Sequence, residues 1–236
     1  MVALFASACR KNNDTPKEDC STLTAPSPSS NSPVGAGSTI SLYAGSISNV
    51  VYYNWTGPNG YTSGSQNPTI PHASAANAGT YSLTITKVSG CVTPAGHVDI
   101  AIDTATCTPV TNTATVTGLP TLSFSSILPN HNGSSGNYRI TANGSNGDLY
   151  LEFGTYAQPV AGVYTLYGID HFTIETNEAT VMMNTNSANW SMGSGAHSKL
   201  FVTVTGGKVS ATFCDVTMSN STWWTSGSVS ANVLEQ

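Results

Sequence analysis

Apolar and polar residues alternate with a period of two along most of the chain after about residue 35. The runs at 39–43 and 81–85 in the first half both follow this pattern, and Val51, Tyr53 and Trp55 share one parity in a third run. Successive side chains of a strand point to opposite faces of a sheet, so each run predicts a strand with one inward face. On this pattern Val51, Tyr53 and Trp55 are expected to lie on one face of the strand, opposite to Tyr52 and Asn54.

The same alternation continues through the second half of the chain. It covers the runs 149–153, 200–204, 209–213 and 229–233. Gly206-Gly207 separates two of these runs and is a strong signal for a two-residue hairpin. About eight strands are expected within the 130 residues of the second half, and they leave no room there for a crossover helix. The pattern therefore predicts an all-β protein of two tandem β-sandwich domains, the second an antiparallel sandwich or an open barrel.

Composition narrows the function classes. Only 8% of the 236 residues are charged, with 7 Lys+Arg, 12 Asp+Glu and a net charge of −5, whereas soluble domains average about 25% charged. No basic block is present, so we expect no nucleic-acid partner. No Asp or Glu lies between Asp19 and Asp99, and acid–base or calcium chemistry needs such groups. We therefore expect no enzyme activity, no cofactor and no metal site.

The first nine residues contain an apolar run of small residues that ends at Cys9. This segment resembles the lipobox of bacterial lipoprotein signals, in which the cysteine is acylated. The resemblance implies that Cys9 carries lipid, that the protein's membrane partner is reached through this lipid, and that the protein is an outer-membrane-anchored lipoprotein of the cell envelope, periplasmic or surface-exposed. The alternative is a frayed hydrophobic terminus with a buried Cys9.

Four cysteines remain if Cys9 is acylated, and they allow three pairings. They are Cys20, Cys91, Cys107 and Cys214. The preferred pairing is Cys20 with Cys91 and Cys107 with Cys214, one disulfide in each domain. The alternative is free buried thiols. The chain has no Cys-x-x-Cys spacing, which argues against a zinc or redox site.

A Trp followed about 25 residues later by Ala-Gly-Thr-Tyr-Ser-Leu (78–83) resembles the immunoglobulin fold with its tyrosine corner. The longer string 53–60, with 66–70, is similar to the Ig-like repeats of large bacterial surface and gliding-type adhesins. The resemblance implies that Trp55 and Tyr81 are scaffold residues.

The second half resembles the uncharacterised C-terminal β-sandwiches of bacterial lipoproteins, through 147–153, 159–164 and 211–216. That resemblance implies a fold and no activity. The expected organisation has four parts: signal remnant and lipobox over 1–9, flexible Ser/Pro-rich tether over 10–34, Ig-like domain over 35–103, and C-terminal β-sandwich over 107–236.

Two kinds of residue in the second half are candidates for a site. Six carboxylates could in principle serve a glycosidase: Asp148, Glu152, Asp170, Glu175, Glu178 and Asp215. Solvent-facing structural roles are the more natural interpretation, as for the Asp170-His171 step. Trp190, Trp223 and Trp224 are the binding candidates, because exposed aromatic rings stack on sugars or protein anchors. The alternative is that they close one end of the core.

Three functional hypotheses follow. The preferred one is a non-catalytic, lipid-anchored surface protein that acts in adhesion or glycan binding, with a polysaccharide bound near Trp223 and Trp224. The second is a structural accessory or display module that docks to another envelope protein through strand edges or loops. The least favoured is a carbohydrate-active hydrolase.

Overall fold

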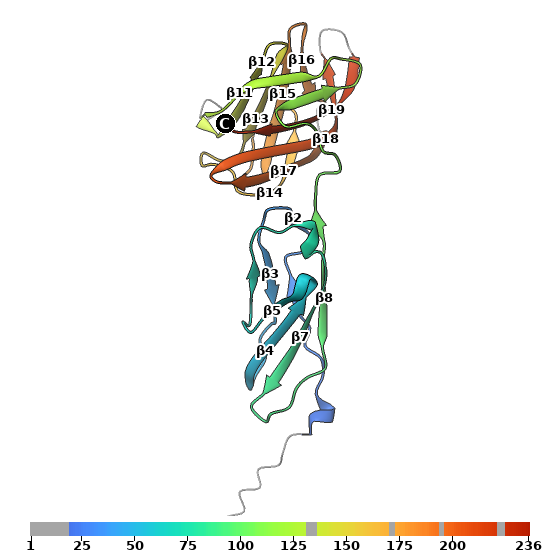
Figure 1. Cartoon of the computed structure of the whole chain (residues 1–236), viewed down its shortest axis with the longest axis vertical. Helices are drawn as coiled ribbons and strands as arrows, with labels where there is room; N and C mark the ends of the chain where they lie inside the picture. The colour runs from blue at the N-terminus through green and yellow to red at the C-terminus, as the bar shows by residue number, and fades with distance from the viewer. Residues whose placement is uncertain (1–18, 131–135, 170–172, 194–195, 221–224) are drawn as a thin grey trace, which may run out of the picture.

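The computed structural model describes residues 19–130, 136–169, 173–193, 196–220 and 225–236. Its strands form two β-sheet domains that follow one another along the chain and lie end to end (Figure 1). Three short 3-10 helices, η1 (Cys20–Thr22), η2 (Pro58–Gly60) and η3 (Ala75–Asn77), interrupt the strands of the first domain. The prediction of an all-β protein is confirmed.

Two sheets form the first domain. One has the order β1-β3-β6 and the other has the order β5-β4-β7-β8. The strands of the two sheets are β1 (Ser29–Ser30), β3 (Ile40–Tyr43), β4 (Val50–Gly57), β5 (Tyr61–Ser63), β6 (Thr69–Ile70), β7 (Gly79–Lys87) and β8 (Gly96–Ile100). A separate parallel pair, β2 (Val34–Gly35) with β9 (Ile102–Asp103), closes the end next to the second domain.

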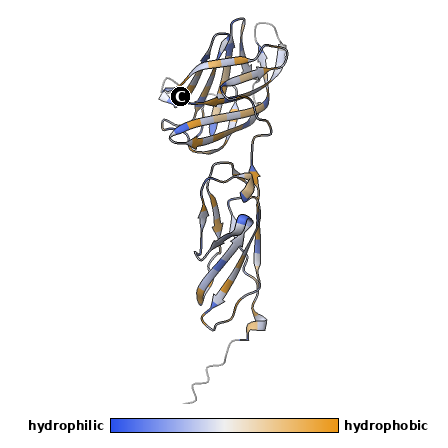
Figure 2. Ribbon diagram, in the orientation of Figure 1, coloured by the Kyte–Doolittle hydropathy of each residue, from blue (hydrophilic) through white to orange (hydrophobic). Residues whose placement is uncertain are grey.

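The core of the first domain lies between these sheets and is formed by the apolar side chains of each strand. Figure 2 shows hydrophobic residues distributed along the strands of both domains. Trp55 is fully buried opposite Leu83 on the neighbouring strand, and Leu42 belongs to the same cluster. Tyr81 is also fully buried, and its hydroxyl donates to the carbonyl oxygen of Asn77 at 3.1 Å. Trp55 and Tyr81 are therefore scaffold residues, as predicted.

One residue departs from the predicted alternation. Val51 is 65% exposed, although it has the parity of Trp55. The pairing of β4 with β7 shifts register between Val50 and Tyr52, and such a bulge leaves one residue unpaired and turns its side chain out of phase. Strict alternation therefore does not hold for the first residues of β4.

The second domain holds ten strands rather than about eight. They are β10 (Thr113–Val116), β11 (Leu122–Asn130), β12 (Arg139–Gly144), β13 (Gly147–Phe153), β14 (Gly162–Tyr167), β15 (Glu178–Thr185), β16 (Ala188–Met192), β17 (His197–Thr205), β18 (Lys208–Asn220) and β19 (Thr225–Leu234). The predicted hairpin at Gly206-Gly207 joins β17 to β18, and both glycines have positive φ (60° and 78°), as a primed turn requires.

The pairing of these strands is closed. The order β13-β12-β11-β10-β19-β18-β16-β15-β14-β17 is completed by pairings of β13 with β15 and of β18 with β17. Each of the ten described strands therefore has a partner on both sides. Their inward side chains form one continuous apolar core. The sheet of the second domain is therefore closed. The sequence had predicted either an antiparallel sandwich or an open barrel, and the closed pairing excludes the open barrel.

Both disulfides are present with the preferred pairing. Cys20 is bonded to Cys91 and Cys107 to Cys214, with Cα–Cα distances of 5.3 and 5.8 Å. The first bond attaches the N-terminal segment to the loop between β7 and β8. The second attaches the segment between the domains to β18, where the pairing with β19 shifts register after Phe213. Disulfides are typical of oxidising compartments.

Part of the predicted tether is ordered. Residues 10–34 were expected to lack structure, but β1 pairs with β3 and the first residue of β2 pairs with β9. The carbonyl oxygen of Pro26 lies against Gly96, where an added Cβ would come within 1.9 Å of it. The segment from Cys20 onward is therefore part of the first domain. Cys9 and the lipobox lie outside the described residues.

Candidate functional site

The three tryptophans chosen from the sequence do not form an exposed group. Trp190 is only 5% exposed and belongs to the core of the second domain, so it is not a binding platform. Its position on β16 alternates inward with Ala188 and Met192, which are also buried. Trp223 and Trp224 lie outside the described residues. Asn220, the last described residue before them, pairs with Trp190.

A surface pocket of about 260 Å³ lies close to Trp190. We call it the distal pocket. It is formed by the turn between β10 and β11, the turn between β12 and β13, and the turn between β15 and β16. Its lining residues are Val116, Leu119, Pro120, Leu122, Asn146, Thr185, Asn186 and Ser187.

The topology places this pocket away from the first domain. β15 begins at Glu178 beside β14, the strand that approaches the first domain, and runs away from it to Thr185. The turn that follows β15 therefore lies at the outer end of the molecule (Figure 1). The ring of Trp190 and the side chain of Val116, which lines the pocket, both lie within 4 Å of a Cβ built on Gly227.

Backbone and side-chain hydrogen bonds hold the turns of the distal pocket together. The backbone N–H of Asn186 donates to the carbonyl oxygen of Asn146 at 3.3 Å, and the side-chain amide of Asn186 donates to that of Ser145 at 3.3 Å. The backbone N–H of Ala188 donates to Oγ1 of Thr185 at 3.1 Å. The two bonds of Asn186 join turns that are about 40 residues apart in sequence, and the bond of Ala188 closes the turn between β15 and β16.

The lining of the distal pocket is uncharged. Two buried aliphatic residues, Val116 and Leu122, form its apolar part together with Leu119, which is 41% exposed. Amide and hydroxyl groups form the remainder. Such a surface offers hydrogen-bond donors and acceptors beside an apolar face and offers no partner for an ionic ligand. It fits a neutral polar molecule with one apolar face.

Among the described carboxylates of the second domain, Asp148 and Glu152 do not form a catalytic pair. Glu152 accepts a 2.7 Å hydrogen bond from Arg139. Asp148 lies four residues earlier on the same strand, about 13 Å away at the usual rise of a strand, which exceeds the separation that a glycosidase uses. Burial first, and then the charge of Asp148, raise the pKa of the Tyr150 phenol.

Two of the other carboxylates chosen from the sequence, Glu178 and Asp215, also have local structural partners. Glu178 accepts from the backbone N–H of Glu175 at 2.9 Å, and Asp215 accepts from the hydroxyl of Ser228 at 3.4 Å. Asp170-His171 lies outside the described residues. Within the ranges that the structure describes, no three His, Cys, Asp or Glu side chains group as metal ligands.

Sequence reasoning missed the distal pocket and one buried acid. The pocket is made by turns, whose sequences show no periodicity, so its residues carry no signal of their own. Glu235 is almost fully buried at the end of the chain, where its Oε1 accepts from the hydroxyl of Tyr138 and its Oε2 accepts from the backbone N–H of Val209 at 2.9 Å. Glu235 lies two positions after Val233, so the alternation of the last strand could have indicated that its side chain faces the core.

No helix among the described residues is both long and apolar enough to span a membrane. No protein-family model matches the chain. No curated protein matches it either. Among solved structures, the chain is similar to the fibronectin(III)-like modules of CbhA from Clostridium thermocellum, at 13% identity and a TM-score of 0.23, over 89% of this chain and 94% of that chain. The fold assignment rests on the strand pairing and the two cores described above.

Proposed function

We propose that this protein is a non-catalytic binding module of the cell envelope, anchored by an acylated Cys9, that binds a neutral glycan at the outer end of its second domain. The observation that carries the proposal is the uncharged distal pocket, in which aliphatic side chains lie beside amide and hydroxyl groups. A sugar ring has the matching chemistry, because it combines an apolar face of C–H groups with hydroxyls at its edge.

The arrangement of the domains supports this function. The turn between β15 and β16, two residues of which line the distal pocket, lies at the end of the molecule opposite η1, where the described chain begins (Figure 1). A chain held to a membrane through its N-terminus would therefore present the pocket outward. Trp223 and Trp224 follow Asn220, which pairs with Trp190 beside the pocket, so we retain them as candidate stacking residues of the same site.

Retention on immobilised neutral polysaccharides tests the proposal. Leu119→Ser should weaken retention about tenfold, because it removes an apolar contact. Asn186→Ala should weaken it several-fold, because one net hydrogen bond is worth about 1 kcal/mol. Trp224→Ala should weaken it as well.

Val160→Ser is the matched control, since Val160 is an exposed aliphatic residue of the second domain outside the pocket. Equal retention of Leu119→Ser and Val160→Ser would remove the assignment of the site to the distal pocket. A wild-type chain that is retained on no neutral polysaccharide would overturn glycan binding itself.

A second candidate function is docking to an envelope protein by strand addition. The described strands of the second domain all have two neighbours, whereas β5 of the first domain pairs only with β4, and only along Trp55–Gly57. A partner strand would therefore add at this edge. Photocrosslinking of one defined protein from Thr62, with none from Leu119, would favour this alternative over the glycan.

A further inference from the structure

The end of the first domain at which the chain enters is apolar. Val88 and Val92, in the loop between β7 and β8, are 68% and 55% exposed, and the bulged Val51 of β4 is also exposed. Backbone hydrogen bonds place them together: the N–H of Val88 donates to the carbonyl oxygen of Asn49 at 2.9 Å, and Val92 forms a bridge with Thr86. We call this surface the basal face.

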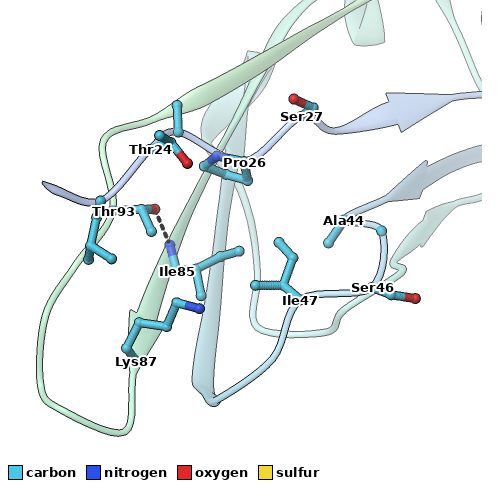
Figure 3. Close-up of a pocket in the computed structure, with 12 residues that line it drawn as sticks. Thr24, Pro26, Ser27, Ala44, Ser46, Ile47, Ile85, Lys87 and Thr93 are labelled. Atoms are coloured by element: carbon cyan, nitrogen blue, oxygen red, sulfur yellow. Dashed lines mark hydrogen bonds between the residues drawn. The ribbon is translucent and has the colours of Figure 1, made fainter.

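A pocket of about 370 Å³ is lined by Lys87, which directly precedes Val88 of the basal face in the chain (Figure 3). Its floor includes Ile85, which is almost fully buried and whose backbone N–H donates to Oγ1 of Thr93 at 3.0 Å. Its outer wall is the segment 23–27. The Cys20–Cys91 disulfide and the packing of Pro26 on Gly96 hold this wall in place, so the pocket is a fixed feature of the domain.

Lys87 is the cation of this pocket. Its Nζ donates to the carbonyl oxygen of Ser48 at 2.7 Å, which leaves further ammonium donors for a ligand. No carboxylate lines the pocket. Asp19 lies in the N-terminal segment next to it, where its carboxylate accepts from the backbone N–H and hydroxyl of Ser21.

The remaining acids of the first domain lie at its other end. Asp99 pairs across from Thr80 at the start of β7, and Asp103 forms an ion pair with Lys199 of the second domain at 3.1 Å. Among the described residues, the basal face combines exposed valines with the ammonium group of Lys87, and the carboxylate of Asp19 lies in the neighbouring N-terminal segment, outside the residues that line the pocket. This is the chemistry that anionic lipid attracts, through apolar insertion and charge.

The length of the chain before the domain limits how far the domain can stand from the proposed acyl anchor. Nine residues lie between Cys9 and Asp19, and the ten steps along the chain can span at most about 35 Å. An acyl group on Cys9 would thus keep the basal face within that distance of a bilayer.

We propose that the basal face is a lipid-contact surface, in which Val51, Val88 and Val92 enter the interface and Lys87 pairs with a lipid phosphate. The inference rests on the proposed acyl anchor for its orientation. It predicts a domain that stands on the membrane instead of swinging freely at the end of a tether.

Vesicle flotation of the full chain carrying Cys9→Ser tests the basal face apart from the anchor. We expect binding to vesicles of phosphatidylcholine and phosphatidylglycerol (7:3) that exceeds binding to phosphatidylcholine alone. Lys87→Gln should reduce the bound fraction about fivefold, as expected for one basic residue near an anionic surface. Val88→Ser with Val92→Ser should reduce it about tenfold.

Two variants outside the basal face are matched controls: Lys208→Gln and Val160→Ser should leave flotation unchanged. Amide exchange in β4 and β7 should be the same in all variants, which shows that the domain is folded. No binding of the Cys9→Ser chain to either vesicle, or equal binding of basal and control variants, would overturn the proposal. A dimer that forms without vesicles and depends on Val88 would also overturn it.

Whether Cys9 is acylated is measured in a separate experiment. Metabolic labelling with radioactive palmitate, compared between the wild type and Cys9→Ser, reports on acylation alone. A chain that floats through its basal face but takes up no palmitate would refute the anchor and retain the lipid-contact surface.

Discussion

The buried pair of Tyr138 and Glu235 shows how a single contact holds the end of the chain. Tyr138 donates its hydroxyl to the carboxylate of Glu235, which also accepts from Val209, and the backbone N–H of Glu235 donates to the carbonyl oxygen of Val209 at 3.0 Å. A buried carboxylate needs such donors to offset its lost hydration. The C-terminal residues are thereby attached to the start of β18.

This pair predicts a loss of stability in alkali. Burial first, and then the hydrogen bond and charge of Glu235, raise the pKa of Tyr138 well above 10.0. Above pH 10 the phenol ionises in the unfolded chain while it stays protonated in the folded one. The free energy of unfolding should therefore be fully retained below pH 10 and fall above it, by at most about 1.4 kcal/mol per pH unit.

Urea unfolding between pH 9 and pH 11 measures this slope. Tyr138→Phe should flatten the slope, and Tyr156→Phe, at an exposed tyrosine of the same domain, should leave it as in the wild type. An identical slope in Tyr138→Phe would show that other groups control the alkaline transition.

At the scale of elements, the two domains treat their strand edges differently. The second domain closes its sheet, so backbone groups along each described strand meet a neighbour. The first domain keeps open edges at β5, β6 and β8 and protects one of them with the segment that carries β1. Open edges are sites for strand addition or aggregation. Among the described strands, the open edges to which a partner strand could add therefore lie in the first domain.

Removal of the Cys20–Cys91 disulfide should loosen this protecting segment. The bond joins residues 71 apart, and the chain-entropy model assigns such a loop a stabilisation of about 4 kcal/mol. In the variant Cys20→Ser with Cys91→Ser, amide exchange should accelerate in β1 and β3. Exchange in β18 and β19 should not change, because they belong to the other core. Unaltered exchange in β1 would contradict the structural role of the bond.

The whole molecule is two bodies in contact end to end. Ser38 donates its hydroxyl to the carbonyl oxygen of Ala161 at 2.9 Å, and Lys199 pairs with Asp103 at 3.1 Å. Gly35 lies directly against Val163. The ion pair is exposed and contributes at most about 1 kcal/mol, so close packing of the glycine is the more important contact. The junction sets the direction of the distal pocket relative to the basal face.

Gly35→Ala should disturb this junction. A Cβ at Gly35 would stand 2.8 Å from both Cγ2 and the backbone nitrogen of Val163, and a backbone atom cannot move aside as a flexible side chain can. Small-angle scattering should show a broader distribution of distances between the domains. Gly193→Ala, where the added Cβ meets nothing within 4 Å, should scatter as the wild type. Indistinguishable scattering of the two variants would show that the junction tolerates the displacement.

The sequence was sufficient for the fold class, the hairpin at Gly206-Gly207 and the tyrosine corner, and it left three pairings of the four described cysteines, of which the preferred one is present. These features depend on local parity, on glycines that reach positive φ, or on a cysteine count small enough to leave three pairings. Trp190 could not be placed from its sequence, because an aromatic residue in an alternating run is equally compatible with the core and with a platform. Its burial depends on strands from distant parts of the chain.

Only the tertiary structure determined where the candidate binding surfaces lie. The closure of the second sheet, the bulge that exposes Val51, and the meeting of three turns at the distal pocket all depend on contacts between residues far apart in sequence. The order in the expected tether likewise follows from its crossing of Gly96. Alternation specifies which side of each strand is apolar, but turns have no period, and only the packed sheets bring them together.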